Sequence, residues 1–143
     1  MGAKKTTLAF VILTWNSERV IERCVRSVFA LKSFDVSAYV VDNGSSDKTV
    51  GILDSLAKEY PQLHVIKRAV NEGTTVPRNL ALKEISPDTD YICVLDSDTE
   101  VNDDAIQAMV KTLDNKRVGI VGPEMRNEAG VLQNSGRKVP TLT

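Results

Sequence analysis

Residues 8–16 read Leu-Ala-Phe-Val-Ile-Leu-Thr-Trp-Asn. Six consecutive apolar residues are typical of a strand that is buried on both faces, as strands of parallel sheets are. The pattern predicts a strand over 8–13, and polar groups begin where it ends, at Thr14, Trp15 and Asn16. A strand of this kind needs helices on both sides of its sheet, so helices and strands should alternate along the chain.

The rest of the chain follows this alternation. Apolar residues recur at helical spacing from Val20 to Phe29, with charged residues between them. Further strands are predicted over 38–41, 64–66, 91–95 and 118–121, and the intervening segments have helical periodicity. The order β-α-β-α-β-α-β-α-β predicts an α/β fold, a mostly parallel sheet with helices on both faces. After Pro123 the pattern stops, and residues 127–130 indicate a hairpin turn.

Composition excludes several classes of protein. The chain has 143 residues, enough for one domain, and a formal net charge of -1 without basic clusters, which argues against a nucleic-acid partner. No apolar run approaches the length of a transmembrane segment. Cys24 and Cys93 both lie within apolar patterns, so we expect buried thiols in a reducing cytoplasm and not a disulfide.

Polar side chains follow three of the predicted strands, at 14–16, 42–44 and 96–98. The carboxyl ends of parallel strands meet at one edge of the sheet, which is where open α/β sheets bind their ligands. A single polar loop would mean little, because most loops are polar. Three at one edge predict a binding site.

Asp96-Ser97-Asp98 is the sharpest of these signals. It follows residues 91–95, which are predicted to form a buried strand. Residues spaced by two point to the same side of a strand, so the two carboxylates can converge on one cation, and such oxygens suit Mg²⁺ or Mn²⁺. The alternative is a turn whose acidic residues cap the next helix.

Three other residues have two interpretations each. Asp42 can accept hydrogen bonds from a base or a ribose, or simply belong to a turn with Asn43 and Gly44. Arg78 can contact a diphosphate near the start of its helix, or be a solvated helix residue. Trp15 can stack on a base or cover the core.

Taken together, these motifs resemble one known family. The chain is similar to the family-two glycosyltransferases of the GT-A fold, a Rossmann-like nucleotide-diphospho-sugar transferase fold, through residues 8–16, 40–47, 71–73 with Arg78-Asn79, and 94–98. The similarity extends from about Leu8 to Val121, and the residues from Gly130 to Arg137 resemble the rhamnosyltransferase-like branch.

The resemblance implies roles for the site residues. It places Thr14, Trp15 and Asn16 around the base and ribose, Asp42 on the base and Arg78 near the base or the diphosphate. Asp96 and Ser97 then approach the nucleotide sugar, and Asp96 and Asp98 hold the metal. The implied reaction is inverting transfer of a sugar from a nucleotide-diphosphate donor to a hydroxyl of a glycan or lipid-linked acceptor. The implied location is cytoplasmic, with peripheral contact at the inner face of the membrane.

The resemblance also sets expected boundaries. Residues 1–7 are expected to form a tail, 8–122 the nucleotide-sugar-binding domain, and 123–143 the incomplete start of the acceptor-side region. The family's catalytic base is expected beyond residue 143, so we assign none, although Glu124 and Glu128 are the nearest downstream carboxylates. Apolar surface left by a missing half would favour a homo-oligomer.

Two alternatives stay open at this point. A nucleotide-sugar-binding module without catalysis would have the same residues. Asp96-Ser97-Asp98-Thr99 also matches the motif of haloacid-dehalogenase-like phosphatases, in which the first aspartate is a nucleophile assisted by Mg²⁺. That motif normally follows the first strand of its domain, whereas here it follows the fourth predicted strand.

Overall fold

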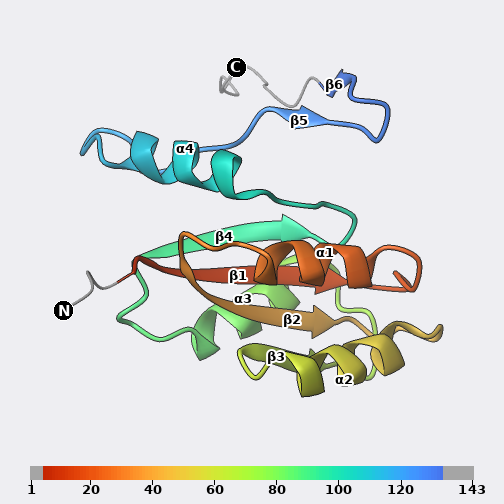
Figure 1. Ribbon diagram of the computed structural model, residues 1–143. Helices are drawn as coiled ribbons and strands as arrows, with labels where there is room; N and C mark the ends of the chain where they lie inside the picture. Colours follow the sequence, from red (N-terminus) through yellow and green to blue (C-terminus); the bar gives the residue numbers. More distant parts are fainter. Residues whose placement is uncertain (1–4, 134–143) are drawn as a thin grey trace, which may run out of the picture. The chain divides into compact units, whose positions relative to one another are not determined.

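A computed structural model describes residues 5–133 of the chain. Its main sheet has four strands in the order β3-β2-β1-β4, and every neighbouring pair is parallel (Figure 1). The strands are β1 (Thr7–Thr14), β2 (Asp35–Asp42), β3 (Leu63–Lys67) and β4 (Tyr91–Asp96). The carboxyl ends of all four therefore lie at the same edge, as the sequence predicts.

Helices cover both faces of this sheet, which confirms the predicted fold class. Helices α1 (Ile21–Phe29) and α2 (Thr49–Glu59) pack against each other on one face, and α3 (Thr75–Glu84) packs against β1 and β2 on the other. In Figure 1, α1 and α2 lie in front of the strands and α3 lies behind them. Because all four strands are parallel, the polar loops that follow them gather at the carboxyl edge.

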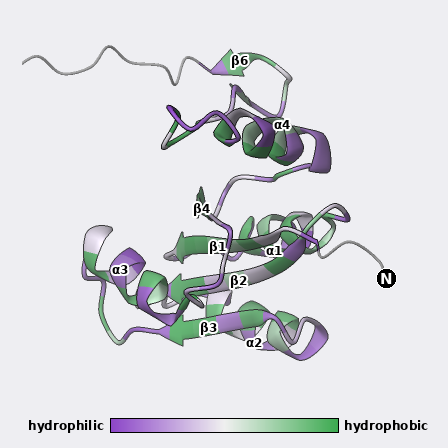
Figure 2. Cartoon of the chain, turned by 90° about the vertical axis from the view of Figure 1, so that its left-hand side faces the viewer, coloured by the Kyte–Doolittle hydropathy of each residue, from purple (hydrophilic) through white to green (hydrophobic). Residues whose placement is uncertain are grey.

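The core follows from the alternation of side chains along the two central strands. Ala9 and Val11 pack with Ala81 of α3, so the alternating residues Phe10 and Ile12 point to the opposite face. All four are fully buried in the central strand. Figure 2 shows the resulting apolar colouring of β1 and β2. The continuous apolar run at residues 8–13 thus reflects burial on both faces, as predicted.

β4 corrects one prediction. Its apolar residues predict a buried strand, but within residues 5–133 it is an edge strand, paired only with β1. Ile92 and Val94 are 49% and 55% exposed, whereas Leu95 on the other face is buried. Apolar residues predict a strand but do not reveal its place in the sheet.

The C-terminal part forms a separate compact unit from Gln107 onward, and the first unit ends at Ile106. Helix α4 (Asp103–Leu113) is followed by the antiparallel pair β5 (Met125–Arg126) and β6 (Leu132–Gln133). The predicted hairpin turn is confirmed, because Asn127 Oδ1 accepts hydrogen bonds from the N–H groups of Ala129 and Val131. The predicted domain boundary at residue 122 stays a prediction.

The predicted fifth strand is wrong. Residues 118–121 have no strand pairing among the described residues, and Ile120 is 92% exposed. Four residues containing a glycine are too weak a pattern without a partner strand. No helix within residues 5–133 combines the length and apolar composition that crossing a membrane requires.

Candidate functional site

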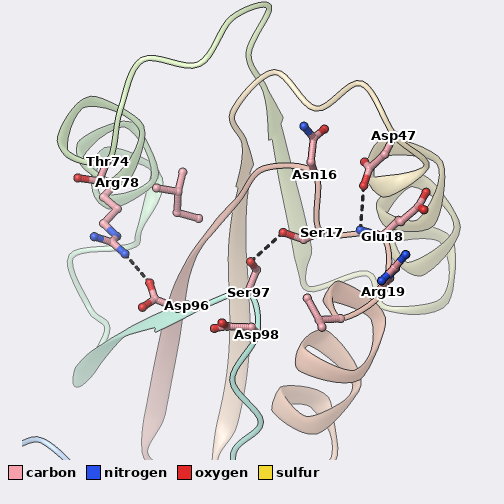
Figure 3. A pocket seen from close by; sticks show the side chains of 12 residues that line it. Asn16, Ser17, Glu18, Arg19, Asp47, Thr74, Arg78, Asp96, Ser97 and Asp98 are labelled. Atoms are coloured by element: carbon pink, nitrogen blue, oxygen red, sulfur yellow. Dashed lines mark hydrogen bonds and ion pairs between the residues drawn. The ribbon is translucent and has the colours of Figure 1, made fainter. Parts of the chain in front are cut away.

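A cavity of about 530 Å³ opens at the carboxyl edge of the sheet (Figure 3). Its walls come from the loops after β1, β2 and β4 and from the start of α3. Its lining consists of Leu13, Asn16, Ser17, Glu18, Arg19, Val20, Asp47, Thr74, Arg78, Asp96, Ser97 and Asp98. Five residues predicted from the sequence, Asn16, Arg78, Asp96, Ser97 and Asp98, therefore meet in one cavity.

The acidic turn after β4 faces Arg78 of α3. Asp96 pairs in register with Leu13, whose side chain packs on the α3 face of the sheet, so the Asp96 carboxylate points to that side. Arg78 Nη2 lies 2.6 Å from Asp96 Oδ1, with the two side chains 30% and 69% exposed. Asp98 lines the same cavity and is exposed. The cavity thus combines two carboxylates with a guanidinium group.

Ser17 joins this turn to the loop after β1. Its Oγ lies 3.0 Å from Ser97 Oγ and donates a hydrogen bond to the carbonyl oxygen of Trp15 at 3.2 Å. Its N–H donates to Thr49 Oγ1 at 2.8 Å. Ser17 therefore connects three loops, through its hydroxyl group and its backbone N–H.

The loops after β1 and β2 are also held together. Asn16 adopts a left-handed backbone conformation with φ of 49°, which asparagine tolerates better than most residues. Its Oδ1 accepts a hydrogen bond from the Ser46 N–H at 2.8 Å, and its own N–H donates to Ser45 Oγ. Desolvation raises the pKa of Asp47, but hydrogen bonds from Thr49 and Glu18 outweigh it and lower that pKa overall.

Thr14, Asp42 and Trp15 are not part of the cavity lining. Thr14 and Asp42 are each 1% exposed, and Asp42 Oδ2 accepts a hydrogen bond from the Ser45 N–H at 3.1 Å. Thr14 Oγ1 and Asp42 Oδ1 have no hydrogen-bond partner in the part of the chain that the structure describes. Trp15 is 54% exposed. The nucleotide contacts expected for these three residues stay predictions.

The two cysteines are unpaired, as expected. Cys24 is 1% exposed, and its Sγ lies 3.7 Å from the carbonyl oxygen of Asp96. Burial, reinforced by the charge of Asp98, raises the pKa of this thiol to about 12. Burial likewise raises the pKa of Cys93 to about 11. The raised pKa values favour the protonated thiols at neutral pH.

Seven residues of the lining were not predicted from the sequence: Leu13, Ser17, Glu18, Arg19, Val20, Asp47 and Thr74. Glu18 and Arg19 belong to the turn that precedes α1, which begins at Ile21. Their position directly after a strand end was the available signal. Among residues 5–133, no group of three or more histidine, cysteine or acidic side chains is arranged so that it could hold a metal ion.

A family model described as glycosyl transferase family 2 matches residues 9–138, which is most of the chain. The chain belongs to this family. The phosphatase alternative therefore has no further support. Its motif normally follows the first strand, whereas Asp96-Ser97-Asp98 lies at the end of β4. The catalytic base stays unassigned; Glu124 forms an ion pair with Arg126 at 2.6 Å.

Two curated proteins illustrate what the chain is similar to. The family-two chain is 31% identical over 118 residues to a beta-monoglucosyldiacylglycerol synthase of Trichormus variabilis, covering 80% of this chain and 25% of that protein. It is 27% identical over 128 residues to a poly-beta-1,6-N-acetyl-D-glucosamine synthase of Staphylococcus epidermidis, covering 87% and 30% respectively. The chain therefore spans less than a third of the length of these relatives.

Solved structures agree on the fold. The structure of S. aureus TarS 1–349 aligns with a TM-score of 0.70 at 25% identity, over 95% of this chain and 39% of that one. Its complex with UDP-GlcNAc aligns with a TM-score of 0.65 at 26% identity, over 78% and 32%. The Pyrobaculum calidifontis mannosyltransferase PcManGT, with a TM-score of 0.72 at 20% identity over 82% and 35%, supports the GT-A fold alone. The rhamnosyltransferase-like branch stays a prediction, and residues 134–137 of its motif lie outside the described residues.

Proposed function

We propose that the cavity binds a nucleotide-diphosphate sugar together with Mg²⁺ or Mn²⁺, and that the whole protein transfers the sugar with inversion to an acceptor hydroxyl. One observation carries the proposal: Asp96, Asp98 and Arg78 line the same cavity at the carboxyl edge of a parallel sheet. Carboxylates suit the cation, and a guanidinium group suits the diphosphate that the cation also contacts.

The charges of the lining support a cation. Four carboxylates stand against two guanidinium groups, a formal excess of two negative charges. Asp47 accepts hydrogen bonds from the backbone N–H groups of Glu18 and Thr49, and Glu18 accepts one from the N–H of Lys48. These two carboxylates are therefore occupied in joining loops. We assign the divalent ion to Asp98 and to Asp96, whose partner Arg78 lines the same cavity and is the proposed diphosphate contact.

The number of acidic ligands also fits the proposed metal. Mg²⁺ commonly binds through one or two carboxylates and completes its coordination with water and substrate phosphates, so a full protein cage is not required. When bound, such an ion offsets the charge that develops on the departing nucleoside diphosphate. Arg78 is placed to orient the same diphosphate and to add a second positive charge.

The relatives support the classes of donor and acceptor. TarS, at 26% identity, is described in a complex with UDP-GlcNAc, a nucleotide-diphosphate sugar. The names of the two curated relatives include a polysaccharide and a glycolipid, which supports an acceptor hydroxyl on a glycan or a lipid. Peripheral attachment to the cytoplasmic face of a membrane would suit a lipid-linked acceptor.

The test uses Trp15, the only tryptophan of the chain, as a reporter of binding. Wild-type protein is titrated with UDP-GlcNAc, GDP-mannose and a dTDP-sugar, each in Mn²⁺, in Mg²⁺ and in EDTA, and thermal unfolding is measured in parallel. We expect one donor class to bind with metal. At a donor concentration of 100 times Kd the stabilisation should be about 2.7 kcal/mol. Absence of any effect with all donors and metals would overturn the proposal.

Asp98→Asn tests the metal ligand, and Asp54→Asn is its matched control. Asp54 undergoes the same loss of charge, but it lies on α2, outside the cavity lining, and pairs with Lys67 at 2.6 Å. We expect Asp98→Asn to remove the metal-dependent part of donor binding while Asp54→Asn retains it. An equal metal dependence in both variants would show that the metal is misplaced.

A further inference from the structure

Asn43 connects the loop after β2 to the loop that leads into α3. It is only 2% exposed. Its Nδ2 donates hydrogen bonds to Asn71 Oδ1 at 3.0 Å and to the carbonyl oxygen of Gly73 at 2.8 Å. Its Oδ1 accepts a third bond from the N–H of Glu72 at 3.0 Å. One buried side chain therefore binds three consecutive residues of the other loop.

The same two loops also meet at the backbone of Gly44. This glycine has φ of +79°, and a Cβ added there would lie 2.9 Å from both the carbonyl carbon and the Cα of Val70. Asn43 itself is anchored to the central strand, because its N–H donates to the carbonyl oxygen of Thr14 at 2.9 Å. Asn43 and Gly44 thus connect the sheet to residues 70–73 at close range.

Residues 70–73 lead into α3 through Thr74. The helix begins at Thr75, directly after this segment, and Thr74 makes no side-chain capping hydrogen bond. The buried residues Pro77 and Ala81 hold one face of the helix to the sheet. Rotation or sliding of its first turn is therefore restrained by the loop, and that turn carries Arg78 into the cavity.

We infer that Asn43 is a positioning residue for donor binding: it fixes residues 71–73 so that α3 presents Arg78 to the diphosphate. The inference rests on the proposed function, because it needs a donor that Arg78 contacts. A purely structural role predicts something different. A structural Asn43 would affect folding and would lower donor affinity by the same factor whether or not Arg78 is present.

A double-mutant cycle separates the two roles. Donor affinity is measured by Trp15 fluorescence in wild type, Asn43→Ala, Arg78→Ala and the double variant, with unfolding free energies from urea titrations of the same proteins. Hydrogen bonds to charged groups are strong, so misplacing the guanidinium group should weaken binding by about tenfold. In the Arg78→Ala background, Asn43→Ala should change affinity by less than about twofold, because the coupled interaction is already lost.

Two further variants secure the result. Asn71→Ala removes the oxygen shared by Asn43 Nδ2 and the Gly73 N–H, but at an exposed position, so it tests the same coupling if Asn43→Ala does not fold. Asp90→Ala removes the acceptor of the Thr7 N–H (2.8 Å) at the opposite edge of the sheet. It should lower stability and leave donor affinity unchanged.

The outcomes distinguish the inference from the proposed function. If wild-type protein binds no donor, both proposals fall. If it binds donor but Arg78→Ala leaves the affinity unchanged, Arg78 is not a donor contact, so the positioning role falls and donor binding stands. If Arg78→Ala weakens binding but Asn43→Ala has the same effect in both backgrounds, only the positioning role is overturned.

Discussion

Gly44 offers the sharpest test of how closely the two loops approach. We predict that Gly44→Ala lowers the free energy of unfolding by about 2–5 kcal/mol. A left-handed backbone costs an alanine about 1–2 kcal/mol. The new methyl group would also lie 2.9 Å from two backbone atoms of Val70, which cannot rotate away as a side chain can. Overpacking of this kind typically costs about 1–3 kcal/mol.

Two other glycines separate these contributions. Gly73 has nearly the same conformation, with φ of +75°, but no atom lies within 4 Å of its added Cβ. Gly73→Ala should therefore cost only the conformational part, about 1–2 kcal/mol. Gly51 lies in α2 with ordinary backbone angles and open space, so Gly51→Ala should stabilise the protein by about 0.5 kcal/mol.

The assay is urea unfolding followed by Trp15 fluorescence and by far-ultraviolet circular dichroism. The three variants and wild type should have the same m-value, which shows that only stability has changed. The difference between Gly44→Ala and Gly73→Ala measures the close approach. Equal losses at both positions would refute the contact between residue 44 and Val70.

Two predictions concern the core. Leu53 is fully buried on α2, so Leu53→Ala should cost about 2–5 kcal/mol in the same urea titration, and a loss below about 1 kcal/mol would contradict its place in the core. The Cys24 thiol has a pKa of about 12 in the folded state and an ordinary value of 9.0, so the unfolded chain loses this proton first as pH rises. Stability should therefore fall between about pH 9 and 12, with a contribution of up to about 1.4 kcal/mol per pH unit from this thiol. Cys24→Ala should have a shallower pH dependence, and an unchanged slope would contradict the prediction.

Most of the fold could be predicted because local pattern and burial agree. The apolar run at 8–13 and the helical stripe that begins at Ile21 each correspond to an element of the structure. The location of β4 at an edge could not be predicted, because the same apolar residues suit a central strand and an edge strand. The prediction of a strand over 118–121 was wrong for a related reason. A short apolar run becomes a strand only when another strand is available to pair with it.

The site was predictable where residues share one strand end, and less so where function depends on contacts between loops. The spacing of Asp96 and Asp98 at the end of a strand predicts that both belong to the site. Asn43 has the sequence signature of an ordinary turn, and its three bonds to residues 71–73 depend on which strand lies beside β2. Arg19 reaches the cavity because it lies in the turn between β1 and α1, and the sequence alone does not show where such a turn points.

The pairing of β1 with β4 has a consequence for synthesis of the chain. Leu8 pairs with Tyr91, and β2, α2, β3 and α3 all lie between them in the sequence. A chain that emerges from the ribosome amino end first can pair β1 with β2 and β2 with β3 early, but the other edge of the apolar strand β1 stays open until β4 appears. Such long-range pairing is slow, and an open strand edge invites pairing with other chains. Of the four strands described, β4, which leads to Asp98 and ends at Asp96, is thus the last to pair, and a translational pause just before residue 91 would prolong the stage at which this edge of β1 is open.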